Sequence, residues 1–269
     1  MVYSMKYIDT HCHIFPHSIA AKVVQNLQEY YHFQWDGTGE ADDLQASLAE
    51  SGIHKAVIFS SATKPEQVIS INDYIAATVQ EAPDRFIGFG TMHPDFAGFR
   101  EEICRIRELG LKGIKFHPDF QRFAIDDERM MPIYEAAGDS LVLLFHTGDR
   151  TSDLSAPHRL ARVLDQMPHL KVIAAHMGGF AAWEEAQKHL IGRNVYMDIS
   201  STTITGEIDT ESVRQLILAH GIGKVLYATD YPAARHRRMI DEVLKMGFSP
   251  EENEAIFYRN AEKLLGITL

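Results

Sequence analysis

Eight short apolar or β-branched runs alternate with amphipathic stretches along the chain, and this alternation constrains the fold more than any other feature. After the second run, successive runs begin roughly 24 to 31 residues apart, the length of one strand–helix unit. Several runs are apolar throughout, as expected of parallel strands buried on both faces. The expected strands are Tyr7–Ile14, Lys55–Ala62, Phe86–His93, Gly113–Pro118, Leu141–Gly148, Lys171–Gly178, Val195–Ser201 and Lys224–Pro232.

The segments between these runs have helical features. Pro65 suits the first turn of a helix over 65–81, and aliphatic residues follow it at helical spacing. The other expected helices are Phe99–Leu109, Pro157–Gln166, Ala181–Leu190, Ser212–His220, Arg237–Met246 and Pro250–Leu265.

Alternating units of this kind predict one α/β domain over residues 1–269, a closed (β/α)8 TIM barrel. The first two runs begin about 48 residues apart, so we expect an extended first connection with an extra helix or a flap. The segment 250–265 adds a C-terminal extra helix. An open doubly wound sheet is the alternative, which is weakened because no Gly-x-Gly-x-x-Gly follows the first run.

Composition narrows the class of partner. Lys and Arg number 26 against 37 Asp and Glu, a net charge of −11, which disfavours a nucleic-acid binder. Two cysteines make no disulfide framework, and no apolar run approaches the ~20 residues of a membrane span. The first expected strand starts a few residues after Met1, which leaves no room for a signal peptide. We expect a cytoplasmic protein that acts on a small molecule and binds no membrane. The sequence leaves open whether the protein forms a homodimer.

Polar residues stand at the C-terminal ends of the expected strands. His11 and His13 project from the same face of the first strand, while Cys12 points the opposite way and is expected to pack in the core. In a parallel barrel all these strand ends meet at one mouth, where buried imidazoles are costly unless they are paired or bind a metal. Convergence therefore predicts a metal centre, although the sequence leaves open whether Asp198 and Ser200 face the mouth. The later strand ends contribute His93, Lys115, His117, His146, His176 and Asp230.

Five motifs, in this order, span nearly the whole chain: DTHCH at 9–13, GIKFHP at 113–118, FHTG at 145–148, AHMGG at 175–179 and TDYP at 229–232. They resemble the amidohydrolase superfamily, and within it the amidohydrolase-related group that includes aminocarboxymuconate-semialdehyde decarboxylase and related aromatic-acid decarboxylases and hydrolases. The resemblance implies that His176 acts as a base or as a donor that polarises the substrate, and that Asp230 is both ligand and proton carrier. The implied metal ligands are His11, His13, His146 and Asp230.

The fourth strand is less settled by the resemblance. Many members carry a carbamylated lysine there that bridges two metals, but a Lys-x-His pattern such as Lys115 and His117 usually accompanies one metal. We therefore expect one divalent metal, with Lys115 and His117 contacting the substrate. The resemblance leaves open whether a second metal binds. His93 is a further candidate for substrate contact, or a residue that only caps its turn. Three imidazoles and one carboxylate suit Zn²⁺ best, with Mn²⁺ or Fe²⁺ as alternatives.

The ligand set predicts a metal-dependent hydrolase. A bound Zn²⁺ lowers the pKa of its water to about 7, and Asp230 can accept the proton of that water and deliver it to a leaving group. The expected substrate is small and carries a carboxylate, with an amide, ester or lactone bond to be cleaved. The alternative is a metal-dependent decarboxylase of an aromatic or unsaturated acid, which release of carbon dioxide would reveal. A non-enzymatic metal-binding barrel is the third hypothesis. A TatD-like nuclease normally has a glutamate on the fourth strand, which this chain lacks.

Overall fold

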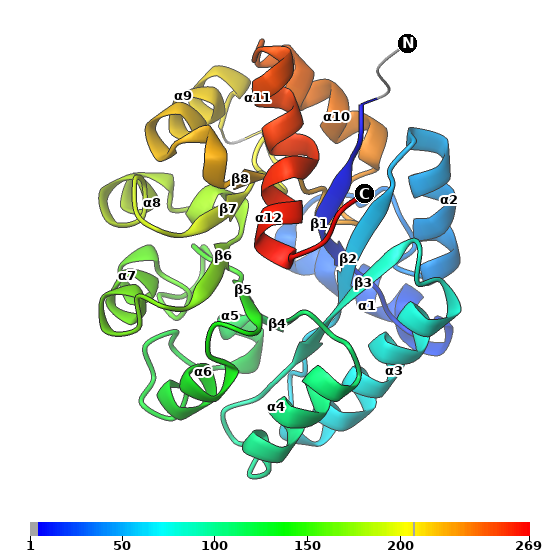
Figure 1. Ribbon diagram of the computed structural model, residues 1–269, viewed down its shortest axis with the longest axis vertical. Helices are drawn as coiled ribbons and strands as arrows, with labels where there is room; N and C mark the ends of the chain where they lie inside the picture. Colours follow the sequence, from blue (N-terminus) through cyan, green and yellow to red (C-terminus); the bar gives the residue numbers. More distant parts are fainter. Residues whose placement is uncertain (1–4, 207) are drawn as a thin grey trace.

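The computed structural model describes residues 5–206 and 208–269, whose strands form one parallel eight-stranded sheet in sequence order (Figure 1). All eight expected strands are present, and most end earlier than expected because their polar, Gly or Pro residues already belong to loops. The closed barrel is confirmed and the open sheet is wrong. The strands are β1 (Ile8–His13), β2 (Lys55–Phe59), β3 (Phe86–Thr91), β4 (Gly113–Phe116), β5 (Val142–Phe145), β6 (Lys171–Ala174), β7 (Tyr196–Asp198) and β8 (Val225–Leu226).

The barrel closes between its first and last strands, at opposite ends of the chain. Thr10 donates its backbone N–H to the carbonyl of Tyr227 at 3.1 Å, and His13 donates to the carbonyl of Tyr231 at 2.7 Å. The buried Asp9 carboxylate joins the same two segments, because its Oδ1 accepts from His11 N at 2.9 Å and from Thr229 N at 3.2 Å. The Thr229 hydroxyl donates to Asp9 Oδ2 at 2.5 Å. Closure therefore carries the end of β1 against the segment after β8.

The helices surround the barrel (Figure 1), and the described residues contain no helix with the length and apolar composition that crossing a membrane would need. The first connection holds two helices, which confirms its expected extra helix, and a π-helical turn over Ala255–Arg259 joins the last two. The short α5 and α6 were not expected, since four and seven residues hardly show a helical period. The helices are α1 (His17–Tyr31), α2 (Ala41–Ser51), α3 (Val68–Glu81), α4 (Phe99–Glu108), α5 (Pro118–Gln121), α6 (Met131–Ala137), α7 (Pro157–Gln166), α8 (Trp183–His189), α9 (Thr210–His220), α10 (His236–Lys245), α11 (Pro250–Glu254) and α12 (Asn260–Leu265).

The barrel interior has its own apolar cluster, separate from the larger cluster between strands and helices. Inward residues such as Phe59 and Leu144 form this inner cluster together with Leu264 and Leu265 of α12. In Figure 1 α12 lies beside β1 and β8, so the C-terminal helix closes the interior. The polar residues are left to gather at the carboxyl ends of the strands, where barrel active sites form.

An irregularity in β1 decides which way its histidines face. Pairing with β2 shifts register between Asp9 and Cys12, the signature of a β-bulge. With strict alternation Ile8 and Cys12 would share a face, yet Ile8 belongs to the inner cluster and Cys12 to the outer one. The bulge thus lets one short strand supply an apolar residue to the inner core and His11 to the mouth. The expected core packing of Cys12 is confirmed.

Gly113 lets β4 approach its neighbours, and replacing it should destabilise the barrel. A Cβ at this position would lie 2.4 Å from the Val142 carbonyl oxygen and 2.7 Å from the Phe89 ring. We expect Gly113→Ala to lower the free energy of unfolding by about 1–3 kcal/mol, measured by urea denaturation. Gly223→Ala is the control, since no described atom lies within 4 Å of its Cβ position, and it should change stability by less than about 0.5 kcal/mol. Equal stability of the two variants would contradict the tight packing around β4.

Candidate metal centre

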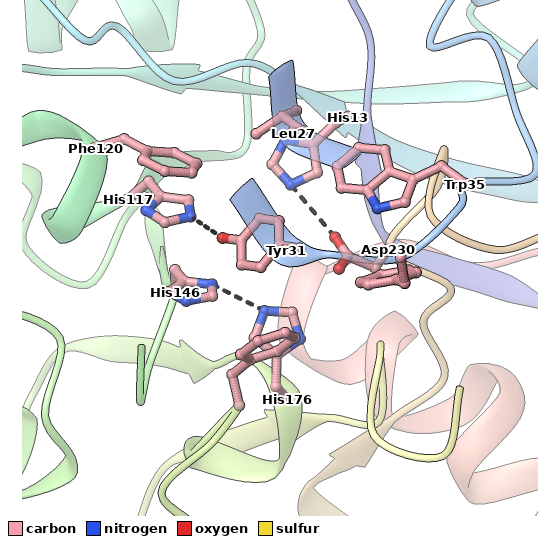
Figure 2. Close-up of a pocket in the computed structure, with 11 residues that line it drawn as sticks. His13, Leu27, Tyr31, Trp35, His117, Phe120, His146, His176 and Asp230 are labelled. Atoms are coloured by element: carbon pink, nitrogen blue, oxygen red, sulfur yellow. Dashed lines mark hydrogen bonds and ion pairs between the residues drawn. The ribbon is translucent and has the colours of Figure 1, made fainter. Parts of the chain in front are cut away.

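Three donor atoms from the two ends of the chain face one another at the barrel mouth. His11 Nε2 lies 3.2 Å from His13 Nε2 and 3.2 Å from Asp230 Oδ1. His13 Nε2 lies 3.5 Å from the same carboxylate oxygen (Figure 2). A tetrahedral ion with bonds of about 2.1 Å holds its ligand atoms about 3.4 Å apart. The arrangement of the three donors therefore fits a divalent metal ion.

Asp198, at the end of β7, orients the first of these ligands. Its Oδ2 lies 3.0 Å from His11 Nδ1, and because a carboxylate only accepts, Nδ1 carries the proton and Nε2 keeps its lone pair for a metal. Asp198 Oδ1 accepts from the backbone N–H groups of His176 and Ser200, both at 3.1 Å. The question that the sequence left open is thus answered, since Asp198 and Ser200 both face the mouth side of the barrel.

The loop after β8 holds Asp230 in a strained conformation. Its φ is +61°, and the nearby His176 and Ser201 have φ of +59° and +54°. Left-handed backbone at a non-glycine residue costs of order 1–3 kcal/mol and persists only where surrounding contacts impose it. One such contact is the Ser201 hydroxyl, which donates to Asp230 Oδ2 at 2.5 Å. The strained residues thus stand after three consecutive strands, β6, β7 and β8, where the backbone conformation orients their side chains toward the site.

The charge of Asp230 is set by its imidazole neighbours. Burial by itself would raise its pKa, but His11, His13 and His176 outweigh burial and hold the pKa well below the usual range. Asp230 is therefore an ionised acceptor, which suits both metal ligation and removal of a proton.

Lys115, on β4, lies beneath the centre and outside the pocket. Its Nζ is 3.2 Å from His11 Nε2 and 5.1 Å from the centre of the Phe59 ring. Burial lowers the pKa of Lys115 to about 8, although Asp230 and Asp198 act in the opposite direction. The structure therefore places Lys115 against a candidate metal ligand, whereas the sequence predicted a contact with substrate.

The remaining predicted histidines divide into two groups. His117, His146 and His176 line the same pocket as His13 and Asp230. His93 is not among the residues that line this pocket; its Nδ1 accepts from the backbone N–H of the nearby Asp95 at 3.2 Å. The position of His93 therefore gives no support to a contact with substrate. It agrees with the other expected role, in which His93 caps its turn.

His146 lies beside the three donor atoms without joining them. Its Nδ1 is 3.0 Å from His176 Nε2 (Figure 2). Its Nε2 faces Asp149 Oδ2 at 3.9 Å. Its place as the fourth ligand of this centre stays a prediction.

Aromatic and aliphatic side chains narrow the mouth to a small pocket. One wall comes from the first connection, and it includes Trp35 (Figure 2). Sequence reasoning missed Tyr31, whose hydroxyl lies 3.0 Å from His117 Nε2. The signal was the run YYHFQW at 30–35, which is unusually rich in aromatic residues. The apolar and aromatic walls are Leu27, Tyr31, Phe33, Trp35, Phe120 and Phe180.

The buried imidazoles make the stability of the metal-free protein depend on pH. Burial is the main cause that lowers the pKa values of His11, His13, His117 and His146 below 6.5. Below about pH 6.5 the unfolded chain binds protons that the folded protein does not, so stability falls by up to about 1.4 kcal/mol per pH unit for each group. Urea denaturation between roughly pH 7.5 and pH 5.5 measures this slope. His13→Asn should make it shallower; a flat wild-type profile would contradict neutral buried imidazoles.

Comparison with known proteins identifies relatives of this chain. A 2-amino-3-carboxymuconate-6-semialdehyde decarboxylase of Dictyostelium discoideum is 25% identical over an alignment 255 positions long, which covers 78% of this chain and 70% of that protein. The structure of 5-carboxyvanillate decarboxylase from Sphingomonas paucimobilis superposes with a TM-score of 0.73 at 19% identity, covering 98% of this chain and 100% of the other. A dihydroxybenzoic acid decarboxylase from Polaromonas sp. JS666, with bound manganese and the inhibitor 2-nitroresorcinol, gives a TM-score of 0.72 at 17% identity over 98% and 97% of the two chains.

The two superpositions show the same barrel fold. The sequence profile of the amidohydrolase family matches residues 8–267, nearly the whole chain. The matched range includes every strand of the barrel and the residues His11, His13 and Asp230. The chain therefore belongs to the amidohydrolase family, as its strand-end motifs predict.

Proposed function

We propose that this amidohydrolase-family enzyme is a metal-dependent decarboxylase of a small aromatic or unsaturated acid. The observation that carries the proposal is the pocket, in which aromatic walls such as Tyr31 and Phe120 close over the candidate metal centre. Flat apolar walls favour a planar, conjugated substrate. The relatives named above support this reading more than hydrolysis, the function first expected from the sequence.

His11, His13 and Asp230 are the residues that would hold the metal. When bound there, a divalent ion supplies Lewis acidity toward a substrate oxygen and lowers the pKa of a water. The donor set suits Zn²⁺, as the sequence predicted, but Mn²⁺ is an equal candidate because manganese is bound in the related Polaromonas structure. Three protein ligands also leave positions open, as catalytic metal sites do.

The residues of the pocket would provide the proton that decarboxylation consumes. The carbon that bears the carboxylate takes up a proton, its bond to the carboxyl carbon breaks, and the electrons of that bond restore the conjugated system as CO₂ leaves. Each turnover thus takes up one proton from solvent. Asp230 and His176 are the proposed carriers, because both line the pocket and are held by Ser201 and Ser200 respectively.

The other pocket residues bind and shield the substrate. His117, which lines the pocket and stacks on the Phe120 ring at 4.0 Å, is proposed to contact it. Lys115 acts from below through His11, so its proposed role is to place positive charge beside the centre. The aromatic walls exclude bulk water, which strengthens charge interactions around the reacting carboxylate.

Product analysis separates decarboxylation from hydrolysis. Metal-loaded protein, supplied with Mn²⁺ or Zn²⁺, should release one CO₂ per molecule of a hydroxybenzoate or a conjugated unsaturated acid. In D₂O the product should carry one deuterium at the carbon that lost the carboxylate, detected by mass spectrometry. Cleavage of esters, amides or lactones with no release of CO₂ from any acid would overturn the proposal in favour of a hydrolase.

Variants of the proton carriers test their roles. Asp230→Asn and His176→Asn should each lower kcat by about 10²- to 10⁴-fold, because each removes a group proposed to move the proton. Metal analysis should show that His176→Asn keeps its metal, which separates proton transfer from ligation. Asp95→Asn is the control, an exposed carboxylate outside the pocket, and it should keep wild-type kcat. Wild-type kcat in His176→Asn would remove this residue from the mechanism.

A further inference from the structure

Gln121, the last residue of α5, carries a buried amide that the proposed reaction does not use. The residue is only 2% exposed. A buried side-chain amide has two N–H donors and a carbonyl acceptor to satisfy, and each one left without a partner costs free energy. The structure gives a partner to both the nitrogen and the oxygen of Gln121, so these partners indicate what the residue does.

The amide of Gln121 joins the carboxyl ends of three consecutive strands. Its Nε2 donates to the carbonyl oxygen of Ala62, after β2, at 2.8 Å and to that of Met92, after β3, at 2.7 Å. Its Oε1 accepts from the backbone N–H of His117, after β4, at 2.8 Å. Because the first two partners accept and the third donates, only one orientation of the amide satisfies all of them. Gln121 therefore fixes the backbone of His117 relative to the ends of β2 and β3.

The loops after β2 and β3 serve as anchors and not as walls of the pocket. No described residue of either loop lines the pocket over the candidate metal centre, whereas His117 and Phe120 both line it. His93, which follows β3, is among the residues outside this pocket. These two loops therefore reach the pocket through their backbone carbonyls, which hold Gln121, and not through their side chains.

The ring of His117 is oriented by contacts of its own. It stacks on the Phe120 ring, with the ring centres 4.0 Å apart and an angle of 17° between the ring planes. Its Nε2 lies 3.0 Å from the hydroxyl of Tyr31 (Figure 2). These contacts set the direction of the ring, while the hydrogen bond from Gln121 sets the backbone position from which the ring extends. Both are needed to place a binding group precisely.

We propose that Gln121 is a positioning residue for substrate binding, which acts through His117. This role rests on the proposed function, because it concerns contact with the same substrate. A small displacement of a binding group weakens its contacts, so loss of the hydrogen bonds of Gln121 should lower the affinity for substrate. His11, His13 and Asp230 stand on or after β1 and β8, away from this anchor. The rate of the chemical step should therefore change little once substrate is bound.

Steady-state kinetics of Gln121→Met tests this role. Methionine keeps the approximate volume of glutamine and removes its hydrogen bonds. With metal-loaded protein and an acid that the wild type decarboxylates, KM should rise about tenfold and kcat should change less than about twofold. Asn72→Leu is the matched control, because Asn72 is another buried amide that donates to Glu102 Oε1 at 2.6 Å and accepts from Thr91 N at 2.7 Å, outside the pocket. This control should lower the urea midpoint as Gln121→Met does, and keep the wild-type KM. An equal rise of KM in both variants would overturn the proposal.

A double-mutant cycle shows whether Gln121 acts through His117. His117→Asn by itself should raise KM, because it removes the group proposed to contact substrate. Adding Gln121→Met to His117→Asn should then raise KM by less than about twofold, since the ring that Gln121 positions is already absent. Fully additive effects of the two substitutions on KM would show that Gln121 acts elsewhere and would overturn the proposal.

Nuclear magnetic resonance measures the position of His117 without any turnover. In histidine-labelled protein loaded with diamagnetic Zn²⁺, the ring resonance that disappears in His117→Asn identifies His117. This resonance should shift in Gln121→Met and stay in place in Asn72→Leu, and an unshifted resonance in Gln121→Met overturns the positioning role. A shift in a protein that decarboxylates no acid supports the positioning of His117 and overturns the proposed function alone. If Gln121→Met does not fold, Gln121→Glu, which removes donor capacity at the same length, replaces it with the same expected shift and rise of KM.

Discussion

The rest of the structure depends on the closure of the barrel between β1 and β8, which the buried carboxylate of Asp9 holds together. One oxygen accepts the N–H groups of His11 and Thr229, and the other accepts the Thr229 hydroxyl. These hydrogen bonds bring residues 220 positions apart into one network. Because His11 and Asp230 each stand next to this network, the same contacts that close the barrel also bring together the donor atoms of the candidate metal centre.

The candidate site contains groups whose burial or backbone conformation is unfavourable in free energy when each is taken alone. Imidazoles lie buried and neutral, and non-glycine residues at strand ends, His176, Ser201 and Asp230 among them, have left-handed backbone. Such features persist where neighbours satisfy or impose them, as Asp198 does for His11 and Ser201 does for Asp230.

Regular elements could be predicted well from the sequence, because buried parallel strands and amphipathic helices leave periodic patterns. Pro157–Gln166 was expected with its observed bounds, and every strand was located. Most strands were expected to run too far at their C-terminal ends. Residues such as His146 and Gly148 directly follow an apolar run in the sequence, but in the structure they belong to the loop after the strand. The short α5 and α6 escaped because they hardly span two turns. The roles of Asp198 and Tyr31 in the site could not be predicted from the sequence. Each role depends on a contact with a residue from a distant segment, His11 for Asp198 and His117 for Tyr31.

The sequence by itself determined the barrel, the family and the set of polar residues at the mouth, because each follows from local periodicity or from motifs of a few adjacent residues. Only the tertiary structure decided how those residues divide. It grouped His11 and His13 with Asp230, turned His146 toward Asp149, placed Lys115 below the pocket and left His93 outside it. The physical reason is that a β-bulge, left-handed loops and barrel closure fix side-chain direction through contacts between distant segments, which no local pattern encodes.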